Sequence, residues 1–364
     1  MNMSAMKNPL MAVLWGAVLV GAATSAYVIV AVDDGTGALS TFTSRSQLDS
    51  YIDEMHGGSY WNERAPSAPD EAADADYTST NVQVQGVDEG DNVKTDGEYI
   101  YLATSQNVTI VDAVPADQME VVTTIEADSI VTAEEGVEMS VRICGLLLHE
   151  DRLVIIAVVH SWVEYADEDI AYAWIIDNFP RTVAAVYDVS DASDPAMVGL
   201  VGLSGGYLTS RAVDGIAYLV TNHFIYTYDE RNFLPVVSTE AGGEEVDATD
   251  ILYDPTASDV GSFTNILALD TETMGFGMLS VLTGYTSTIY MSAENLYLTY
   301  QKWTGDVVVE DGDLEPEESI SATTAIHKVE TDGLSMRVTA SGTVTGWLLN
   351  QFSMDERDGY LRVA

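Results

Sequence analysis

One short pattern appears in five copies along this chain and limits its fold more than any other feature. Each copy is a turn containing Asp, Glu or Gly, followed by a strand rich in Tyr, Leu, Val and Ile, as in DGEYIYLAT from Asp96. The other copies are HEDRLVIIAV from His149, VDGIAYLVT from Val213, SAENLYLTY from Ser292 and ERDGYLRVA from Glu356. β-branched and aromatic residues between turn residues are typical of strands, and helical periodicity nearly disappears after Thr80. We therefore predict an all-β domain.

The spacing of the copies favours a β-propeller. Most copies precede a second strand that ends at an Asp-type turn, as in NVTIVDA, TVAAVYDVSDASDP, TNILALDTETM and TAIHKVETDG. The turns at Asp96, Glu150, Asp214, Glu294 and Asp358 lie 54, 64, 80 and 64 residues apart, which fits a blade of about 40–50 residues plus an insertion. Sheets packed radially cover each other's faces, whereas one small sheet cannot. We predict about four to five blades' worth of repeats in residues 80–364, with a β-sandwich as the alternative.

Residues 10–32 form an apolar run without a charged residue, preceded by Lys7 and followed by Asp33 and Asp34. Such a run is long enough to cross a bilayer as a helix, and the lysine predicts that the N-terminus stays inside. The alternative is a signal peptide cleaved among the small residues 21–26, which would give a secreted protein. The apolar run continues through Val32, which favours the uncleaved anchor. We predict a single-pass membrane protein whose bulk is extracytoplasmic.

A short amphipathic helix and an acidic linker are predicted in residues 33–79. Leu48, Tyr51, Ile52 and Met55 have the i, i+3, i+4, i+7 spacing of one helix face. Ser44 or Ser46 is suited to cap the start of this helix. Residues 59–77 are rich in Ala, Pro, Asp and Glu without periodicity, which is typical of a mobile tether.

The charge of the chain limits its partners. Its 364 residues include 58 acidic and 14 basic ones, for a net charge of -44, which repels nucleic acids and anionic membranes. The acidic residues are spread along the whole chain, which indicates a surface solvated for a salt-rich medium, as in a halophile. An acidic tail for cations or basic partners is the alternative. Cys144 is the only cysteine, which excludes an internal disulfide and favours a small buried apolar side chain.

Several motifs resemble those of a known family. The stretch TSTNVQVQGVDEGDNVKTDGEYIYLAT from Thr78 is similar to the opening signature of exported archaeal and bacterial proteins with a C-terminal β-propeller distantly related to WD40 repeats. SGGYLTSRAVDGIAYLVT from Ser204 and WLLNQFSMDERDGYLRVA from Trp347 are similar as well. Gly90 departs from the signature, where we expect Ala. The resemblance implies fold and export but no activity, so no catalytic residue is carried over.

The family members are longer than this chain, which ends at Ala364 just after a copy of the repeated strand. We therefore expect a propeller that is incomplete at its C-terminal end. Residues 80–94 have no later copy. We predict that they form an entry strand that closes the ring by pairing with the last blade, the part of the propeller that we expect this chain to lack.

An insertion at residues 161–181 is the predicted partner-binding region. It carries aromatic side chains among acidic residues, at Trp162, Tyr165, Tyr172, Trp174 and Phe179. Aromatic residues are enriched at interaction hot spots and sugar-stacking sites, so the expected partner is a protein, a glycan or a cell-envelope polymer. The alternative is that these rings pack the loop onto the blades. Two other insertions, residues 227–262 and 305–319, are predicted to be acidic loops.

A serine motif provides an alternative function. Gly202, Ser204 and Gly206 match the G-x-S-x-G nucleophile elbow, with His223, Asp250 or His327 as partners. That elbow requires a following helix, whereas the residues after Ser204 indicate strand, turn and strand. We predict a glycine-rich turn and no catalytic residue. An exported hydrolase-like enzyme remains the alternative to a binding or structural surface module.

Acidic clusters raise the question of calcium, which takes six to eight oxygen ligands. The candidate groups are Asp88, Glu89 and Asp91; Asp188, Asp191 and Asp194; and Asp311, Asp313, Glu315, Glu317 and Glu318. None matches the D-x-[DN]-x-[DN]-G loop, and a chain this acidic forms such clusters by composition alone. The five histidines also lack metal-binding spacing. We predict no cofactor and no metal residue, and a calcium-dependent adhesin is a further alternative.

Overall fold

The repeated turns join the first two strands of successive sheets. In the computed structural model, Asp214 and Gly215 connect β13 (Gly206–Val213) to β14 (Ile216–Phe224) with φ of 48° and 82°. Asp358 and Gly359 connect β24 (Met354–Arg357) to β25 (Tyr360–Val363) with φ of 54° and 80°. Two-residue turns with positive φ at both positions match the twist of a hairpin and favour Asp-Gly. The repeat therefore has a local backbone cause.

The structure describes ten ranges of the chain. These are residues 28–29, 39–57, 83–133, 137–164, 173–175, 180–225, 234–239, 242–257, 260–304 and 321–364. Within the predicted anchor, only β1 (Val28–Ile29) is described, as a strand paired with β25. None of the helices in these ranges combines the length and the apolar character that crossing a membrane requires. The predicted tether at residues 59–77 and the predicted loop at 305–319 lie outside the described residues.

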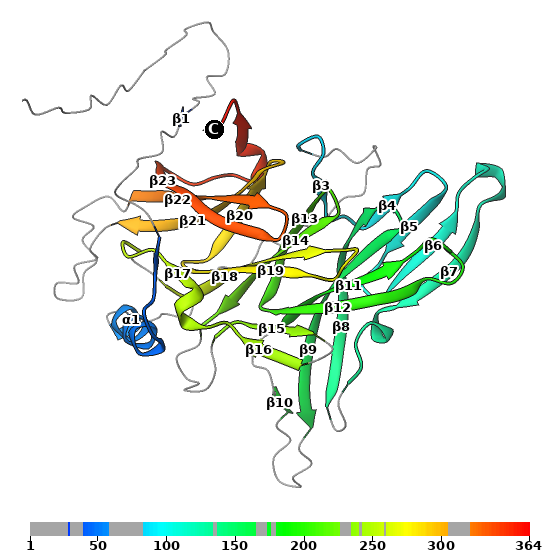
Figure 1. Ribbon diagram of the computed structural model, residues 1–364, viewed down its shortest axis with the longest axis horizontal. Helices are drawn as coiled ribbons and strands as arrows, with labels where there is room; N and C mark the ends of the chain where they lie inside the picture. The colour runs from blue at the N-terminus through cyan, green and yellow to red at the C-terminus, as the bar shows by residue number, and fades with distance from the viewer. Residues whose placement is uncertain are drawn as a thin grey trace, which may run out of the picture.

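Four blades, each built on four consecutive antiparallel strands, follow one another along the chain (Figure 1), and added strands extend the second and third blades to seven-stranded sheets. The first blade contains β4 (Val93–Thr95), β5 (Tyr99–Ala103), β6 (Asn107–Asp112) and β7 (Glu120–Glu126). The second contains β8 (Glu138–His149), β9 (Arg152–Glu164), β11 (Arg181–Asp188) and β12 (Ala196–Ser204). The third contains β13, β14, β18 (Ser262–Asp270) and β19 (Phe276–Thr283), and the fourth contains β20 (Thr286–Met291), β21 (Asn295–Thr304), β22 (Ser321–Asp332) and β23 (Ser335–Thr345).

β24 and β25 form a fifth, smaller sheet with β1 at its edge. The all-β prediction is confirmed, and the sheets that the structure describes do not close into a ring. The repeated strand after each turn is the second strand of its blade rather than the first, because another strand precedes every turn. Short 3-10 turns lie between strands at Ala116–Gln118, Ala127–Ser129 and Gln351–Ser353.

Alternate side chains of each middle strand pack against different neighbouring blades. In β9, Leu153 and Ile155 pack against the first blade, whereas Val154 and Ile156 pack against the third. β14 and β18 likewise divide their side chains between the second and fourth blades. Tyr297 of β21 packs against the fifth sheet. Both faces are therefore buried, which explains why these strands read as continuous apolar runs without alternation.

The insertion at residues 227–262 is not the simple loop that we predicted. Its described part contains β15 (Val236–Thr239), β16 (Gly242–Glu245), a 3-10 turn at Ala248–Asp250, and β17 (Ile251–Tyr253). β15 pairs with β12 of the second blade, and β17 runs parallel to β19 of the third. β2 (Ser40–Thr41) then pairs with β17. The outer edge strands of the second and third blades pair with β15 and β17 because edge strands carry unpaired backbone groups.

The predicted amphipathic helix is confirmed as α1 (Arg45–Gly57). Ser44 Oγ accepts a hydrogen bond from Gln47 N at 3.2 Å, so Ser44 rather than Ser46 caps it. Leu48 and Ile52 are buried against Phe263 and other residues at the outer edge of the third blade. The helix is therefore packed on the propeller body.

Candidate functional site

The first strands of the blades lie next to one another: β4 contacts β8, β8 contacts β13, and β13 contacts β20. Residues 83–92 run along this inner edge. Their strand β3 (Asp88–Glu89) pairs with β13, and Asp91 forms a bridge with Leu146 of β8. The prediction of a closing strand on the last blade is therefore wrong for the part of this segment that the structure describes. The free inner edges of the second and third blades bind it instead, because their backbone groups need partners.

Asp88 connects the first and second blades. Lys94 of β4 is 5% exposed, and its Nζ lies 2.6 Å from Asp88 Oδ1. Asp88 Oδ2 accepts a weaker bond from the backbone N–H of Leu148 in β8 at 3.4 Å. An ammonium so well buried needs a charged partner, and the acidic segment supplies it.

Glu89 connects the third blade to the fifth sheet. Arg211 of β13 is 5% exposed, and its Nη2 lies 3.9 Å from Glu89 Oε2 and 2.6 Å from Gln351 Oε1. Gln83 donates from Nε2 to the carbonyl oxygens of Gln351 and Met354 at 2.9 and 3.0 Å. The segment thus contacts the fifth sheet through side chains, while its backbone pairs with the third blade.

In the first calcium candidate, the carboxylates of Asp88, Glu89 and Asp91 all interact with other groups of the chain. Asp88 and Glu89 pair with Lys94 and Arg211, and Asp91 Oδ1 accepts a hydrogen bond from Asn92 N. In the second candidate group, Asp188 pairs with Arg152 at 2.8 Å. Hydrogen bonds from Ser190, with the Arg152 charge, hold the pKa of Asp188 below its usual value. Residues 311–318 lie outside the described residues.

Across the ranges that the structure describes, no group of three or more His, Cys, Asp or Glu side chains is placed to hold a metal ion. The sequence did not identify Lys94, Arg211 and Gln351 as partners of Asp88 and Glu89; we call these five residues and Gln83 the inner network. One signal was present, since Lys94 is one of only four lysines and lies six residues from Asp88.

Gly90 occupies the point of closest approach between the segment and the third blade. An added Cβ would overlap Ser210 Oγ and lie 2.9 Å from Tyr207 Oη. Ser210 is fully buried and its Oγ is 3.0 Å from Tyr207 Oη, so neither hydroxyl group moves freely. The close packing explains why glycine stands where the family signature led us to expect alanine.

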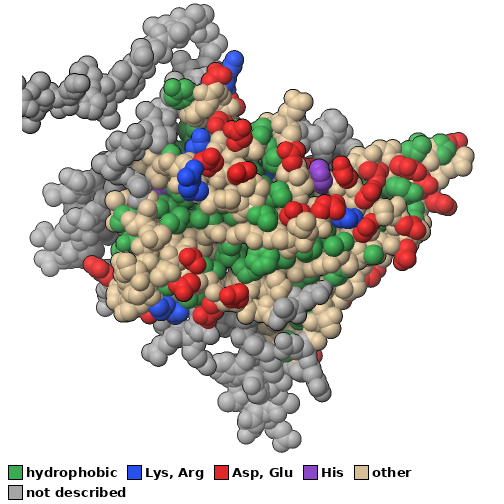
Figure 2. Space-filling view, in the orientation of Figure 1, with side chains coloured by type: hydrophobic (Ala, Val, Ile, Leu, Met, Phe, Trp, Pro, Cys, Tyr) green, Lys and Arg blue, Asp and Glu red, His purple; other side chains and the backbone are tan. Residues whose placement is uncertain are grey.

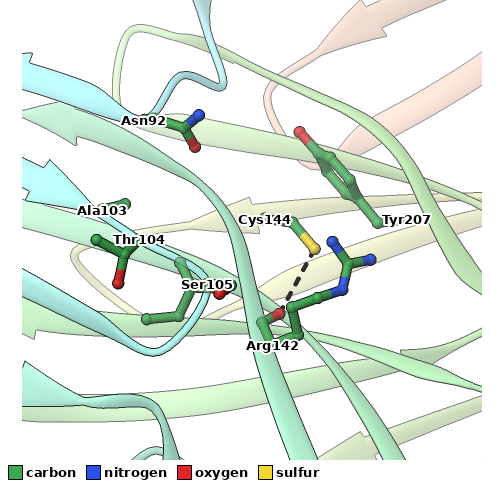
Figure 3. Close-up of a pocket in the computed structure, with 8 residues that line it drawn as sticks. Asn92, Ala103, Thr104, Ser105, Arg142, Cys144 and Tyr207 are labelled. Atoms are coloured by element: carbon green, nitrogen blue, oxygen red, sulfur yellow. Dashed lines mark hydrogen bonds between the residues drawn. The ribbon is translucent and has the colours of Figure 1, made fainter. Parts of the chain in front are cut away.

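A pocket of about 400 Å³ opens beside this contact (Figure 3). The inner-edge segment contributes Asn92, the first blade residues 103–105, the second residues 142–144, and the third Tyr207. The Asn92 amide, the Thr104 and Ser105 hydroxyl groups, the Arg142 guanidinium and the Tyr207 hydroxyl can all form hydrogen bonds with a ligand. The eight lining residues include neither a histidine nor a carboxylate.

Cys144 lies in this pocket as a half-buried thiol. Its Sγ is 3.5 Å from the carbonyl oxygen of Arg142, to which it donates a weak hydrogen bond. Burial raises the pKa of the Cys144 thiol, and the nearby Arg142 charge only partly opposes this effect. Because the thiolate is the reactive form, Cys144 is a poor nucleophile at neutral pH.

The described strands of the predicted partner-binding insertion, the end of β9 and β10 (Ala173–Ile175), lie at the lower edge of the molecule in Figure 1 and form an arm with β8. There β9 pairs with β8 on one side and with β10 on the other. Trp162 of β9 is half-buried and stands opposite both Glu138 and Ile175. Trp174 lies in β10, opposite Val163. Tyr165, Tyr172 and Phe179 lie outside the described residues.

Ser204 is the last residue of β12 and leads through Gly205, with φ of 107°, directly into β13. Its Oγ accepts a hydrogen bond from Val236 N at 3.0 Å. The strand, turn and strand confirm the glycine-rich turn. Of the proposed partners, Asp250 ends a 3-10 turn, His223 lies in β14 and His327 lies in the fourth blade.

His327 belongs to a separate buried cluster. Its Nδ1 lies 2.7 Å from Ser341 Oγ and its Nε2 lies 3.3 Å from Tyr300 Oη. Tyr300 and Lys302 both bond to Asp254, which follows β17. Burial lowers the pKa of His327 to about 4. Burial alone would raise the pKa of Asp254, but hydrogen bonds from Lys302, Thr256 and Tyr300 prevail and bring it to about 2.

Comparison with known proteins agrees with this architecture. The family model of the beta propeller domain matches residues 77–364. An uncharacterized protein of Archaeoglobus fulgidus is 24% identical over 358 residues, covering 79% of this chain and 52% of the relative. An uncharacterized protein of Methanocaldococcus jannaschii is 24% identical over 366 residues, covering 79% and 49%. The chain spans about half the length of these curated relatives, and no solved structure matches it.

We expect Gly90→Ala to lower the free energy of unfolding by about 1–3 kcal/mol, because overpacking at a buried contact carries that cost. Adding Ser210→Ala removes the hydroxyl that the new methyl group meets, so the double variant should regain part of the loss. Gly206→Ala is the matched control, since its Cβ would meet only Pro180 Cγ at 3.7 Å. Denaturant melts measure all three, and equal stability of Gly90→Ala and Gly206→Ala would refute the close contact.

The His327 cluster should make stability depend on pH. Because the folded pKa of about 4 is below the ordinary value of 6.5, the unfolded chain binds a proton between these values and the folded chain does not. Stability therefore falls as pH drops from 6.5 to 4, by at most about 1.4 kcal/mol per pH unit from this group. His327→Gln should melt with a shallower pH dependence than the wild type. His160→Gln, at an exposed histidine of β9, should keep the wild-type slope, and parallel slopes for both variants would contradict the assignment.

Proposed function

The chain belongs to the beta propeller domain family, and we propose that it is a membrane-anchored, extracytoplasmic binding module that takes an uncharged polar ligand, such as a glycan, in the pocket between its first three blades. The pocket carries this proposal. Its amide, hydroxyl and guanidinium groups suit the many hydroxyl groups of a sugar. Blades fixed by their shared cores hold these groups in place, as expected for a site on a rigid scaffold.

Charge supports an uncharged ligand. Acidic side chains are scattered over the face shown in Figure 2 and are dense where the first blade lies. With a net charge of -44, the molecule repels nucleic acids and other polyanions. Arg142 is an exposed cation within the pocket, so it can donate a hydrogen bond to a hydroxyl or ether oxygen. Its single positive charge does not overcome the repulsion between a polyanion and the negative charge of the whole molecule.

The apolar residues 10–32 support the anchored location, since their length suits a bilayer. The spread of acidic residues supports a salt-rich environment. The arm formed by β8, β9 and β10 supports a second contact surface, at which Trp162, Tyr165, Tyr172, Trp174 and Phe179 would bind a protein or a cell-envelope polymer.

The test measures the binding of neutral oligosaccharides by calorimetry at molar salt. Arg142→Gln should weaken binding at least about tenfold, because a hydrogen bond from a charged donor contributes about 1.5–3 kcal/mol and 1.4 kcal/mol is tenfold. Arg337→Gln is the matched control, since Arg337 forms an exposed surface pair in the fourth blade.

Two results would contradict the proposal: no binding of any neutral oligosaccharide, or equal binding by Arg142→Gln and the wild type. Loss of binding in Trp162→Ala but not in Arg142→Gln would move the ligand contact from the pocket to the arm.

A further inference from the structure

The turn between β5 and β6 leads into a tripeptide that N-glycosylating enzymes accept. Asn107, Val108 and Thr109 fit the pattern Asn-x-Ser/Thr, in which the middle residue is not proline. The sequence contains one other such tripeptide, which begins at Asn2. The apolar residues 10–32 lie between the two. A membrane-anchored chain with an extracytoplasmic propeller therefore has Asn2 inside and Asn107 outside.

The turn holds the Asn107 side chain by its amide oxygen and leaves the amide nitrogen without a partner. Residues 104–106 are exposed and Asn107 is half-buried. Thr104 Oγ1 accepts a hydrogen bond from Asn107 N at 3.1 Å and donates one to Asn107 Oδ1 at 3.0 Å. Among the described residues, no group accepts a hydrogen bond from Asn107 Nδ2, and this atom is not one of the buried polar atoms without a partner. Asn107 Nδ2 therefore reaches solvent.

The hydroxyl group that the tripeptide requires lies on the same face of the sheet as the asparagine. β6 starts at Asn107, and side chains two residues apart along a strand point to the same side. Val108 points to the other side, where it is 0% exposed and packs in the core shared with the second blade. Thr109 is half-buried. Asn107 and Thr109 thus project together from the face that points away from this core.

The backbone of the turn keeps its hydrogen bonds whether or not Asn107 is modified. Ser105 O accepts a hydrogen bond from Ile143 N of the second blade at 3.0 Å, and Gln106 O accepts one from Ala127 N at 2.7 Å. A sugar on Asn107 Nδ2 replaces one N–H and leaves these bonds in place. Because an unmade hydrogen bond is what makes the loss of a polar group costly, the folded turn tolerates the sugar.

We propose that Asn107 carries an N-linked glycan, an inference that rests on the extracytoplasmic location in the proposed function. The donor is an oligosaccharide joined through a phosphate to a lipid carrier. Asn107 Nδ2 attacks the anomeric carbon of the first sugar, and a C–N bond forms as the bond from this carbon to the phosphate oxygen breaks. The phosphate leaves with the lipid, and the amide proton passes to a base of the transferase. Thr104 and Ser105 of the same turn line the pocket, so the glycan begins near the pocket.

The test is the mass of the full chain purified from a salt-adapted host that N-glycosylates its exported proteins. In a peptide map, the peptide with Asn107 should be heavier by one oligosaccharide, and the peptide with Asn2 should have its unmodified mass. Asn107→Gln and Thr109→Ala should each remove the added mass, whereas Thr109→Ser should keep it because serine retains the hydroxyl group. Thr124→Ala is the matched control and should keep the glycan, since Thr124 stands opposite Thr109 on the same face but outside the tripeptide.

A second acceptor separates failure of this inference from failure of the proposed location. Asp247 is exposed and precedes Ala248 and Thr249, so Asp247→Asn creates the same pattern in the insertion of the third blade. The new amide oxygen can still accept the hydrogen bond from Thr249 N. This change is combined with Asn107→Gln. A glycan on the double variant but not on the wild type would overturn the site at Asn107 and leave the location standing.

The absence of a glycan from both chains would overturn the site and also contradict the extracytoplasmic location. A glycan at Asn2, or one that remains on the single variant Asn107→Gln, would likewise overturn the proposal.

Discussion

The structure depends on the need to cover both faces of each blade. A four-stranded sheet whose middle strands are apolar on both sides cannot fold alone, because either exposed face would leave a hydrophobic layer in water. Here Leu153 and Val154, adjacent in β9, serve two different cores. Stability is therefore shared between neighbours, as in other repeat architectures. In the described part of the first blade, Leu102 and Val121 are exposed exceptions to this rule.

The inner segment addresses a second constraint, the free edges of the first strands. Asp88 and Glu89 satisfy backbone groups of β13 and also bring carboxylates to Lys94 and Arg211. Burying an ion pair gains little stability by itself, since desolvation offsets the attraction. Removing one partner leaves an uncompensated buried charge, which is strongly unfavourable. The network therefore fixes where the segment lies more than it adds to the free energy of folding.

Features governed by local chemistry could be predicted from the sequence, and those governed by distant contacts could not. The Asp-Gly turns and α1 follow from backbone preference and helical spacing, and both were found where the residues indicated them. Glu89 has partners in Arg211 and in Gln351, which lies 262 residues away, and the pairing of β15 with β12 joins an insertion to the preceding blade. The pocket combines three blades. The spacing of Asn92, Arg142 and Tyr207 in the sequence does not indicate that they line one pocket.

Several of the described cations lie at junctions between the parts of the molecule. Arg152 of the second blade pairs with Glu272 of the third, and Lys328 of the fourth lies 3.8 Å from Glu356 of the fifth sheet. Lys302 pairs with Asp254 across the junction with the third blade. In a molecule with a charge of -44, self-repulsion opposes the compact state. Cations at the junctions between blades reduce this repulsion where the blades would come apart on unfolding. Dissolved salt screens the charges on the rest of the surface. Basic residues at these junctions thus oppose the charge repulsion between neighbouring parts of the molecule.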